Sequence, residues 1–124
     1  MSPLREEAAL SVASYLDGRL RDRIFIHHQH RLVRILLHEI KYVEAHRAYC
    51  RLVTTGGRYT LSIPLAAFAR QLPDNRLWRA HRSYLVNLHW VEEVADRCLI
   101  IDGTSVPIAR AQYEELGDHL QLIR

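Results

Sequence analysis

Residues 49–63 read YCRLVTTGGRYTLSI, in which two short runs of β-branched and aromatic residues flank Gly56 and Gly57. Runs of this kind are typical of strands, and adjacent glycines accept the positive φ angles that a tight turn needs. The stretch therefore predicts a β-hairpin whose two-residue loop is Gly56-Gly57. It is the strongest local indication that this is a β protein.

Similar strand-like runs lie on both sides of the predicted hairpin. Polar turns separate them, and Asp102-Gly103 predicts a second tight hairpin turn. The runs are RIFIH (23–27), LVRILL (32–37), IKYVEA (40–45), LWRAH (77–81), HWVEEV (89–94), CLIID (98–102) and SVPIA (105–109).

Three segments have the spacing of helices instead. One is LAAFARQL (65–72), which lies between Pro64 and Pro73. The other two carry apolar stripes at helical spacing, at Leu4, Ala8, Val12, Tyr15, Leu16 and Leu20, and at Tyr113, Leu116, Leu120 and Ile123. The predicted fold is mainly β, with about eight short strands, a short helix between strands and a helix at each end. We predict one domain over residues 23–124, preceded by an N-terminal helix and linker over residues 1–22.

The composition is that of one soluble domain. The 124 residues are 48% hydrophobic, which allows one core and is too little for two comfortable ones. The chain has no apolar run of about 18 residues and no secretory signal, so we predict a cytoplasmic protein without a membrane span. Cys50 and Cys98 lack C-x-x-C spacing, and we expect both to be reduced thiols that pack in the interior.

The basic residues are unevenly distributed. The net charge is only +3, yet residues 23–110 contain 13 basic and 7 acidic side chains. Between Ala45 and Val91 a single acid, Asp74, faces seven arginines: Arg47, Arg51, Arg58, Arg70, Arg76, Arg79 and Arg82. A block of one sign favours a polyanionic partner, because no interspersed acids cancel its field.

The sequence offers little for catalysis. It has no glycine-rich phosphate loop, no G-x-S-x-G elbow and no H-E-x-x-H. HHQH at residues 27–30 places His28 and His30 on one face of a strand, but no carboxylate or thiol at suitable spacing completes a metal site. Glu44 and His46 resemble an acid–base pair, although adjacent residues at a strand end usually orient a loop. We therefore predict no enzymatic activity, no cofactor and no metal.

The basic residues gather in three predicted loops. Cationic tips on three loops of a β scaffold are typical of a nucleic-acid reader. In RAHRSYLVN (79–87) the polar half would face the nucleic acid, while the apolar half would anchor the loop in the core. The candidate residues are His46, Arg47, Tyr49 and Arg51 in the first loop, Arg79, His81, Arg82 and Ser83 in the second, and Arg110 in the third.

At this point the sequence resembles the LytTR family of bacterial DNA-binding domains, from about Ile24 to Ile123. The most specific motif is R-x-H-R-S-Y-L-V-N, followed by G-x-x-V-P-I-x-R at residues 103–110. The resemblance implies an elongated fold of small β-sheets whose loops enter successive major grooves of double-stranded DNA and bend it. It also implies a transcription regulator, commonly with a phosphoacceptor receiver domain ahead of the DNA-binding part.

Carried over to this sequence, the resemblance places Arg82 and Arg110 at base-reading positions. A third such position falls near Cys50, and since cysteine is a poor hydrogen-bond donor, His46, Arg47 or Arg51 can take its place. The resemblance implies phosphate contacts for Arg79, His81 and Ser83, and structural roles for Glu44, Asn87 and the apolar residues 84–86.

Several alternatives stay open from the sequence. About 23 residues precede the domain, too few for a receiver, so we expect an excised or stand-alone domain or a regulatory protein that binds in trans. The resemblance suggests promoter direct repeats, with a homodimer on DNA as one option. The alternative function is a protein-interaction or ligand- or redox-sensing module without DNA binding, motivated by Cys50. A metal-dependent enzyme built on HHQH is a weaker third.

Overall fold

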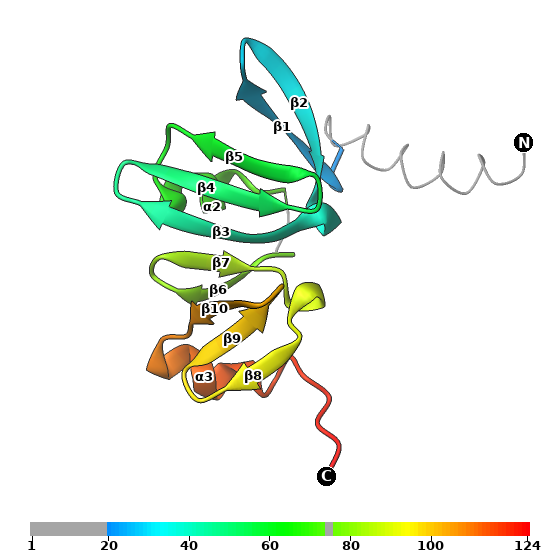
Figure 1. Ribbon diagram of the computed structural model, residues 1–124, viewed down its shortest axis with the longest axis vertical. Helices are drawn as coiled ribbons and strands as arrows, with labels where there is room; N and C mark the ends of the chain where they lie inside the picture. The colour runs from blue at the N-terminus through cyan, green and yellow to red at the C-terminus, as the bar shows by residue number, and fades with distance from the viewer. Residues whose placement is uncertain (1–19, 74–75) are drawn as a thin grey trace, which may run out of the picture.

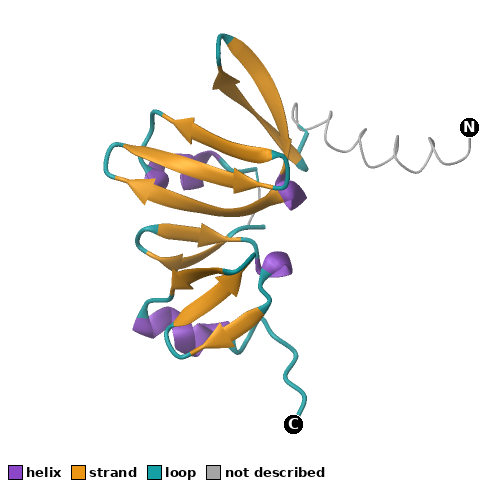
Figure 2. Cartoon of the chain, in the orientation of Figure 1, coloured by secondary structure: helices purple, strands orange, loops and turns teal. Residues whose placement is uncertain are grey.

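The computed structural model describes residues 20–73 and 76–124, and antiparallel strands make up most of them (Figure 1). The strands form three small sheets that follow one another along the long axis of the molecule. Figure 2 shows how few helical turns accompany them. The prediction of a mainly β fold built from small sheets is confirmed, while the predicted N-terminal helix lies outside the described residues.

Within the described residues there are ten strands and two short α-helices. The first sheet pairs β1 (Arg23–His28) with β2 (Arg31–Leu36). The central sheet has the order β5-β4-β3-β7-β6, with bounds Ile40–His46 (β3), Tyr49–Thr54 (β4), Gly57–Leu61 (β5), Trp78–His81 (β6) and Tyr84–Val86 (β7). The third sheet contains β8 (Glu93–Ala95), β9 (Cys98–Ile101) and β10 (Thr104–Pro107). The helices are α2 (Leu65–Gln71) and α3 (Arg110–Leu116).

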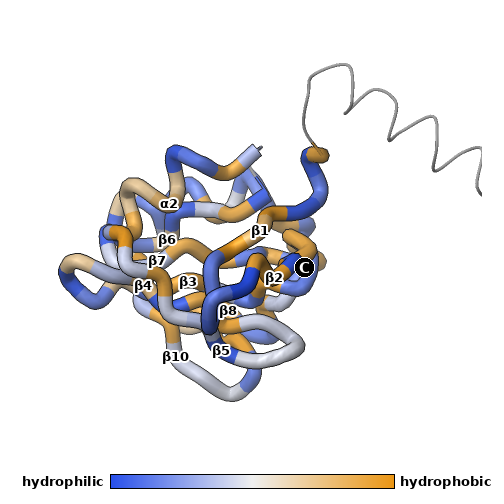
Figure 3. Tube along the Cα trace, turned by 90° about the horizontal axis from the view of Figure 1, so that it is seen from above, coloured by the Kyte–Doolittle hydropathy of each residue, from blue (hydrophilic) through white to orange (hydrophobic). Residues whose placement is uncertain are grey.

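The central sheet is buried on both faces, and each face has its own core. Side chains of a strand alternate between faces, so Val43 and Leu85 enter one core while their neighbours Tyr42 and Val86 enter the other. The upper core lies under β1, β2 and α2 and contains Ile26, Ile35, Leu37, Ile40, Val43, Cys50, Leu52, Leu65, Phe68, Leu77 and Leu85. The lower core lies against β9, β10 and α3 and contains Tyr42, Ala80, Val86, Leu99, Ile101, Val106, Ile108 and Leu116. Figure 3 shows the resulting changes between hydrophobic and hydrophilic residues along the chain.

The central and third sheets are also tied together at one edge. The Lys41 ammonium lies 2.6 Å from a carboxylate oxygen of Asp102, in the β9–β10 turn. The same ammonium lies 5.4 Å from the ring centroid of Trp90, whose indole N–H donates to the carbonyl of His38 at 2.9 Å. These contacts fix the third sheet against the central one.

The predicted hairpin at residues 49–63 is present, but its turn is shifted by one residue. Thr54 pairs with Gly57, so the two turn residues are Thr55 and Gly56 rather than Gly56 and Gly57. The Thr54 hydroxyl explains the shift, since it accepts from the N–H groups of Gly56 and Gly57 at 3.1 Å and donates to the Gly57 carbonyl at 2.8 Å. The second predicted turn is confirmed, because Asp102 and Gly103 join β9 to β10 with φ of 55° and 76°.

Three other predictions need correction. Tyr84–Val86 forms a strand of its own, β7, which brings the strand count to ten instead of about eight. The strand predicted over residues 89–94 begins only at Glu93. Before it, Leu88–Trp90 forms a 3-10 turn capped by the Asn87 side chain, which accepts from the His89 N–H at 3.1 Å. The last helix ends at Leu116, and Ile123, predicted to pack, is 88% exposed.

Candidate nucleic-acid interface

Three loops lie along one long edge of the molecule, on the left in Figure 1. They are the β3–β4 turn, the β6–β7 turn and the β10–α3 junction. The Ala45 N–H donates to the Ser83 carbonyl at 2.8 Å, and the Ala109 N–H donates to the Ala80 carbonyl at 2.8 Å, so backbone bonds join each loop region to the next. We call this surface the loop edge and define it by His46, Arg47, Tyr49, Arg51, Arg79, His81, Arg82, Ser83 and Arg110.

The β3–β4 turn presents an exposed arginine in a strained backbone conformation. His46 pairs with Tyr49, which leaves Arg47 and Ala48 as the turn residues. Arg47 has φ of 59°, a left-handed conformation that residues with a side chain rarely adopt. The rings of His46 and Tyr49 stack beneath the turn, with centroids 5.3 Å apart and planes at 10°. The turn therefore combines an exposed arginine with a stacked pair of aromatic rings at the strand ends.

Glu44 is the acceptor that connects this turn to its neighbours. One of its carboxylate oxygens lies 2.9 Å from His46 Nε2 and 3.6 Å from an Arg51 guanidinium nitrogen. The other accepts from the Tyr84 hydroxyl at 3.1 Å. Burial and the negative charge of Glu44 raise the pKa of Tyr84, so this hydroxyl stays protonated and remains a donor. Glu44 thus links β3, β4 and β7 behind the loop edge.

The β6–β7 loop is braced from within. Arg79 donates from Nε to the His81 carbonyl at 2.9 Å and from Nη2 to the Arg82 carbonyl at 2.7 Å. The Ser83 N–H donates to His81 Nδ1 at 3.1 Å, which leaves the other ring nitrogen of His81 as a donor. Arg82 stands at the tip, exposed, and its guanidinium makes no ion pair or hydrogen bond with any residue that the structure describes.

Arg110 occupies the third loop, at the first residue of α3. The Gln112 side chain donates to the Arg79 carbonyl at 2.6 Å and anchors α3 against β6. The Arg110 side chain is exposed, and over residues 20–73 and 76–124 it has no hydrogen-bond or ion-pair partner. Three loops therefore display one exposed arginine each whose side chain has no hydrogen-bond or ion-pair partner among the described residues: Arg47, Arg82 and Arg110.

Cys50 does not belong to this surface, so its predicted contact with DNA needs correction. Its side chain is fully buried in the upper core, on the same face of β4 as Leu52, and burial raises the pKa of the thiol to about 11. Alternation along the strand indicates this from the sequence, because residues 50, 52 and 54 share one face. Both cysteines are free, as predicted, although Cys98 is only partly buried.

The histidines of HHQH are not gathered into a metal site in the described part of the chain. Gln29 and His30 are the turn residues between β1 and β2, with φ of 50° and 63°, and the ring of His28 packs edge-on against Tyr59. The part of the chain that the structure describes contains no cluster of three or more His, Cys, Asp or Glu side chains that could hold a metal ion. No described helix is both long enough and apolar enough to cross a membrane.

Sequence reasoning missed two roles in this region. Tyr84 was assigned to the core, yet its hydroxyl reaches Glu44. Arg79 was assigned to phosphate contact, yet two of its guanidinium nitrogens donate within its own loop. A tyrosine at the start of the apolar run YLV is a sequence signal for the first role, since a buried tyrosine usually needs a partner for its hydroxyl. The second depends on loop geometry and has no signal in the sequence.

Comparisons with known proteins identify the fold and the family. The fold is similar to the LytTr DNA-binding domain of a protein described as a methyl-accepting/DNA response regulator from Bacillus cereus, with a TM-score of 0.65 and 18% identity, covering 80% of this chain and 96% of that one. The sequence is 27% identical over 90 residues to the sensory transduction protein LytT of Bacillus subtilis, covering 68% of this chain and 37% of LytT. It is 29% identical over 112 residues to the transcriptional regulatory protein YpdB of Escherichia coli K12, covering 84% of this chain and 46% of YpdB.

The matched part of this chain therefore spans less than half the length of LytT and of YpdB. The profile of the family described as the LytTr DNA-binding domain matches residues 30–121, which include the whole loop edge. The chain belongs to the LytTR family of DNA-binding domains.

Proposed function

We propose that this chain binds double-stranded DNA in a sequence-specific manner as the non-enzymatic DNA-binding part of a transcription regulator. The observation that carries the proposal is the loop edge, where three loops joined by backbone hydrogen bonds each display one unengaged arginine. The family membership and the transcriptional regulator YpdB among the relatives support the same function.

Two of the displayed arginines are proposed to read bases. Arg82 and Arg110 are exposed, their guanidinium groups have no partner among the described residues, and the backbone beneath each is held by hydrogen bonds. A guanidinium free to present two parallel donors can bind O6 and N7 of guanine in the major groove. Each such pair contributes roughly 1–3 kcal/mol of discrimination against the wrong base.

The remaining residues of the loop edge are proposed to contact phosphates or to position those that do. Arg47 is displayed at a turn tip and His81 keeps one ring nitrogen as a donor, which suits phosphate contact. Arg79 and Arg51 already bind within the protein, Arg79 to carbonyls and Arg51 to Glu44, so we assign them to positioning. Phosphate contacts add affinity that falls with salt and carries no sequence information.

The first experiment selects bound duplexes from a random library with the wild type, Arg82→Ala and Arg58→Ala. Arg58 is also an exposed arginine, on β5, and it pairs with Val53 near the end of β4 remote from the β3–β4 turn, so it controls for the loss of one positive charge. We expect a recovered motif that loses information at one position in Arg82→Ala and is unchanged in Arg58→Ala. For the best site, the affinity of Arg82→Ala should fall by roughly 5- to 150-fold, the equivalent of 1–3 kcal/mol.

The competing outcomes are distinct. Binding that depends on salt and recovers no motif would reduce the loop edge to a general electrostatic surface and favour an interaction module. Equal losses in Arg82→Ala and Arg58→Ala would refute base reading by Arg82. A redox-sensing module loses its original support, because the Cys50 thiol is buried and its raised pKa keeps it protonated.

The arrangement on DNA is part of the same proposal. We propose that two copies of the domain occupy direct repeats in a promoter, with receiver control supplied from elsewhere in a longer protein or by a protein that binds in trans. Titration of one-repeat and two-repeat duplexes tests this, with two copies bound per two-repeat duplex as the expected result. One copy on both duplexes would contradict it.

A further inference from the structure

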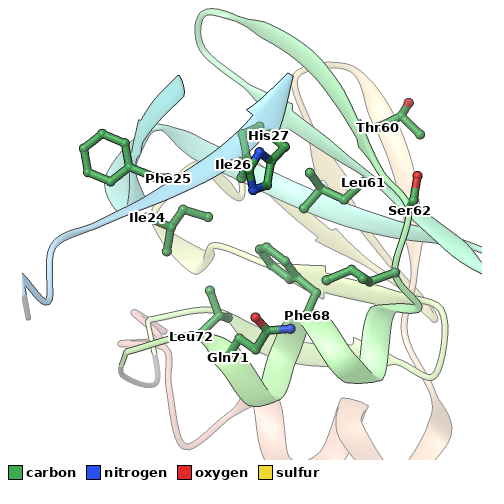
Figure 4. Close-up of a pocket in the computed structure, with 11 residues that line it drawn as sticks. Ile24, Phe25, Ile26, His27, Thr60, Leu61, Ser62, Phe68, Gln71 and Leu72 are labelled. Carbon is green, nitrogen blue, oxygen red and sulfur yellow. The ribbon is translucent and has the colours of Figure 1, made fainter. Parts of the chain in front are cut away.

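An apolar groove lies away from the loop edge, between β1, β5 and α2 (Figure 4). Its volume is about 520 Å³. Side chains from all three elements point toward one another across it, among them Ile24 of β1, Leu61 of β5, Phe68 of α2 and Leu72 directly after α2. At its upper rim Phe25 is 57% exposed, although it is a large hydrophobic side chain.

Two open strand edges border this groove. Among the described residues, β1 pairs only with β2, and β5 pairs only with β4. Exposed apolar surface beside open strand edges is unfavourable in water and is commonly covered by another segment. The structure therefore leaves room for an apolar occupant at this position.

We propose that the occupant is the N-terminal segment of this same chain, residues 4–16, docked as an amphipathic helix. The segment lies outside the described residues, and the argument for it rests on its sequence. With 3.6 residues per turn, Leu4, Ala8, Val12 and Leu16 fall on one stripe, with Tyr15 beside them. A stripe of this kind needs an apolar surface to cover it.

The point where this segment joins the domain supports an intramolecular contact. Arg21 donates to the Pro73 carbonyl at 3.0 Å, which places the entering chain beside the end of α2, next to Leu72 of the groove. The Asp22 carbonyl accepts from the Leu37 N–H at 2.9 Å, and two residues later Ile24 lines the groove. Only a few residues therefore separate the segment from the groove. A tether this short gives an effective concentration in the millimolar range, which another protein would have to exceed.

The test is hydrogen exchange measured by mass spectrometry on the full 124-residue chain. We expect amides of residues 4–16 to be protected in the wild type. Leu16→Asp places a charge in the apolar stripe and should reduce this protection roughly tenfold or more, whereas Leu10→Asp, the same change facing away from the stripe, should leave it largely intact. Both variants make the same change of leucine to aspartate, one on the apolar stripe and one opposite it, so a difference between them reports which face of the segment docks.

The groove side has a matched pair of its own. Phe25→Asp changes an exposed residue that lines the groove, and Leu32→Asp changes a residue of the same hairpin that is 62% exposed and does not line it. We expect loss of protection in residues 4–16 for Phe25→Asp and none for Leu32→Asp. Unchanged exchange in β3 and β4 of both variants verifies that the domain stays folded.

Three results would overturn the proposal. Unprotected amides over residues 4–16 in the wild type would show that the groove has no such occupant. Equal protection in Phe25→Asp and Leu32→Asp would place the segment elsewhere. Protection that disappears on tenfold dilution, with a concentration-dependent sedimentation coefficient, would identify the occupant as the segment of a second copy. None of these outcomes depends on DNA binding.

Discussion

Leu85 and Val86 are neighbours in a three-residue strand, yet each fills a different core. Leu85 is 4% exposed and packs in the upper core, while Val86 is fully buried in the lower core. Truncating either to alanine should therefore destabilise the domain, and each change should act on its own side of the central sheet. If only one face of the strand were buried, the substitution on the exposed face would be tolerated.

The magnitudes follow from the atoms removed. Leu85→Ala removes the three outer carbons of a buried side chain, Cγ, Cδ1 and Cδ2, and leaves a cavity. The free energy of unfolding should fall by about 3 kcal/mol, within a usual range of roughly 2–5 kcal/mol. Val86→Ala removes two buried methyl groups, or about 1.6 kcal/mol of transfer free energy plus a cavity contribution, for a total near 2 kcal/mol. Both losses are large beside the roughly 5–15 kcal/mol that stabilises a typical domain.

Urea unfolding followed by fluorescence and circular dichroism measures both losses. The two tryptophans, Trp78 and Trp90, pack against the lower core, so fluorescence reports that half and circular dichroism the whole sheet. Leu32→Ala and Val94→Ala are the controls, because both residues are exposed strand residues of the same chemical types. We expect each control to change the free energy of unfolding by less than about 0.5 kcal/mol.

Hydrogen exchange then locates the damage. Leu85→Ala should accelerate exchange first in β1, β2 and α2, and Val86→Ala first in β8, β9 and β10, since local opening follows the weakened contacts. If either variant is no less stable than its exposed control, the assignment of β7 to two cores is wrong. If both accelerate exchange only on one side, the sheet does not separate two cores.

Three further predictions concern the loop edge and the cysteine behind it. Burial raises the pKa of Cys50 from its ordinary value of 9.0 to about 11, so the contribution of its neutral thiol to stability is fully present below pH 9 and is lost as the pH rises through 11. Cys50→Ala should abolish this alkaline loss, of about 2 to 3 kcal/mol, in urea titrations at several pH values, and identical alkaline slopes for wild type and variant would contradict it. Arg47→Asn should raise the free energy of unfolding by about 0.5 to 1 kcal/mol, since asparagine tolerates the left-handed turn conformation, and a loss of stability would show that the turn is unstrained. The same change should reduce the slope of log binding constant against log salt concentration by about one, since one phosphate contact is lost. Tyr84→Phe removes the hydroxyl that binds Glu44 and should cost about 1 kcal/mol in the same urea assay, while Tyr113→Phe, at an exposed site, should cost nothing measurable.

Part of this fold could be predicted from local patterns, because strands such as β4 and β9 bury alternate residues. The turns at Asp102-Gly103 and near Gly56 follow from residues that accept positive φ, and the first was placed correctly. The other turn moved by one residue because the Thr54 hydroxyl organises it, a side-chain contact that glycine spacing alone does not reveal.

The missed strand and the overextended one have tertiary causes. The run Tyr84–Val86 shows no alternation because both faces of the central sheet are covered, so its pattern reads as a core segment of undefined type. Residues 88–90 carry strand-like residue types, but the Asn87 cap and the Trp90 indole bond to His38 hold them in a 3-10 turn. Contacts to distant parts of the chain decide both cases.

The candidate site shows the same division between what sequence can and cannot predict. The three cationic loops could be listed from the sequence, since each follows a predicted strand and carries at least one arginine. Which arginines are displayed could not, because that depends on bonds such as those from Arg79 to the carbonyls of its own loop. Cys50 was predicted to lie near a base-reading position, but alternation along β4 correctly places its side chain in the core with Leu52.

The distinction between displayed and engaged side chains also explains how this small domain can hold a precise surface on loops. Arg82 can be presented in one position only if the loop backbone beneath it is fixed, and Arg79 and His81 supply four of the hydrogen-bonding atoms that fix it. A guanidinium that binds its own loop gives up part of its attraction for phosphate in exchange for rigidity, and rigidity reduces the conformational entropy lost when DNA binds. The excess of arginine in this region therefore has two physical causes, of which only one is attraction to a polyanion. Charge counts along the sequence measure both together, and only the hydrogen bonds of the folded loops separate them.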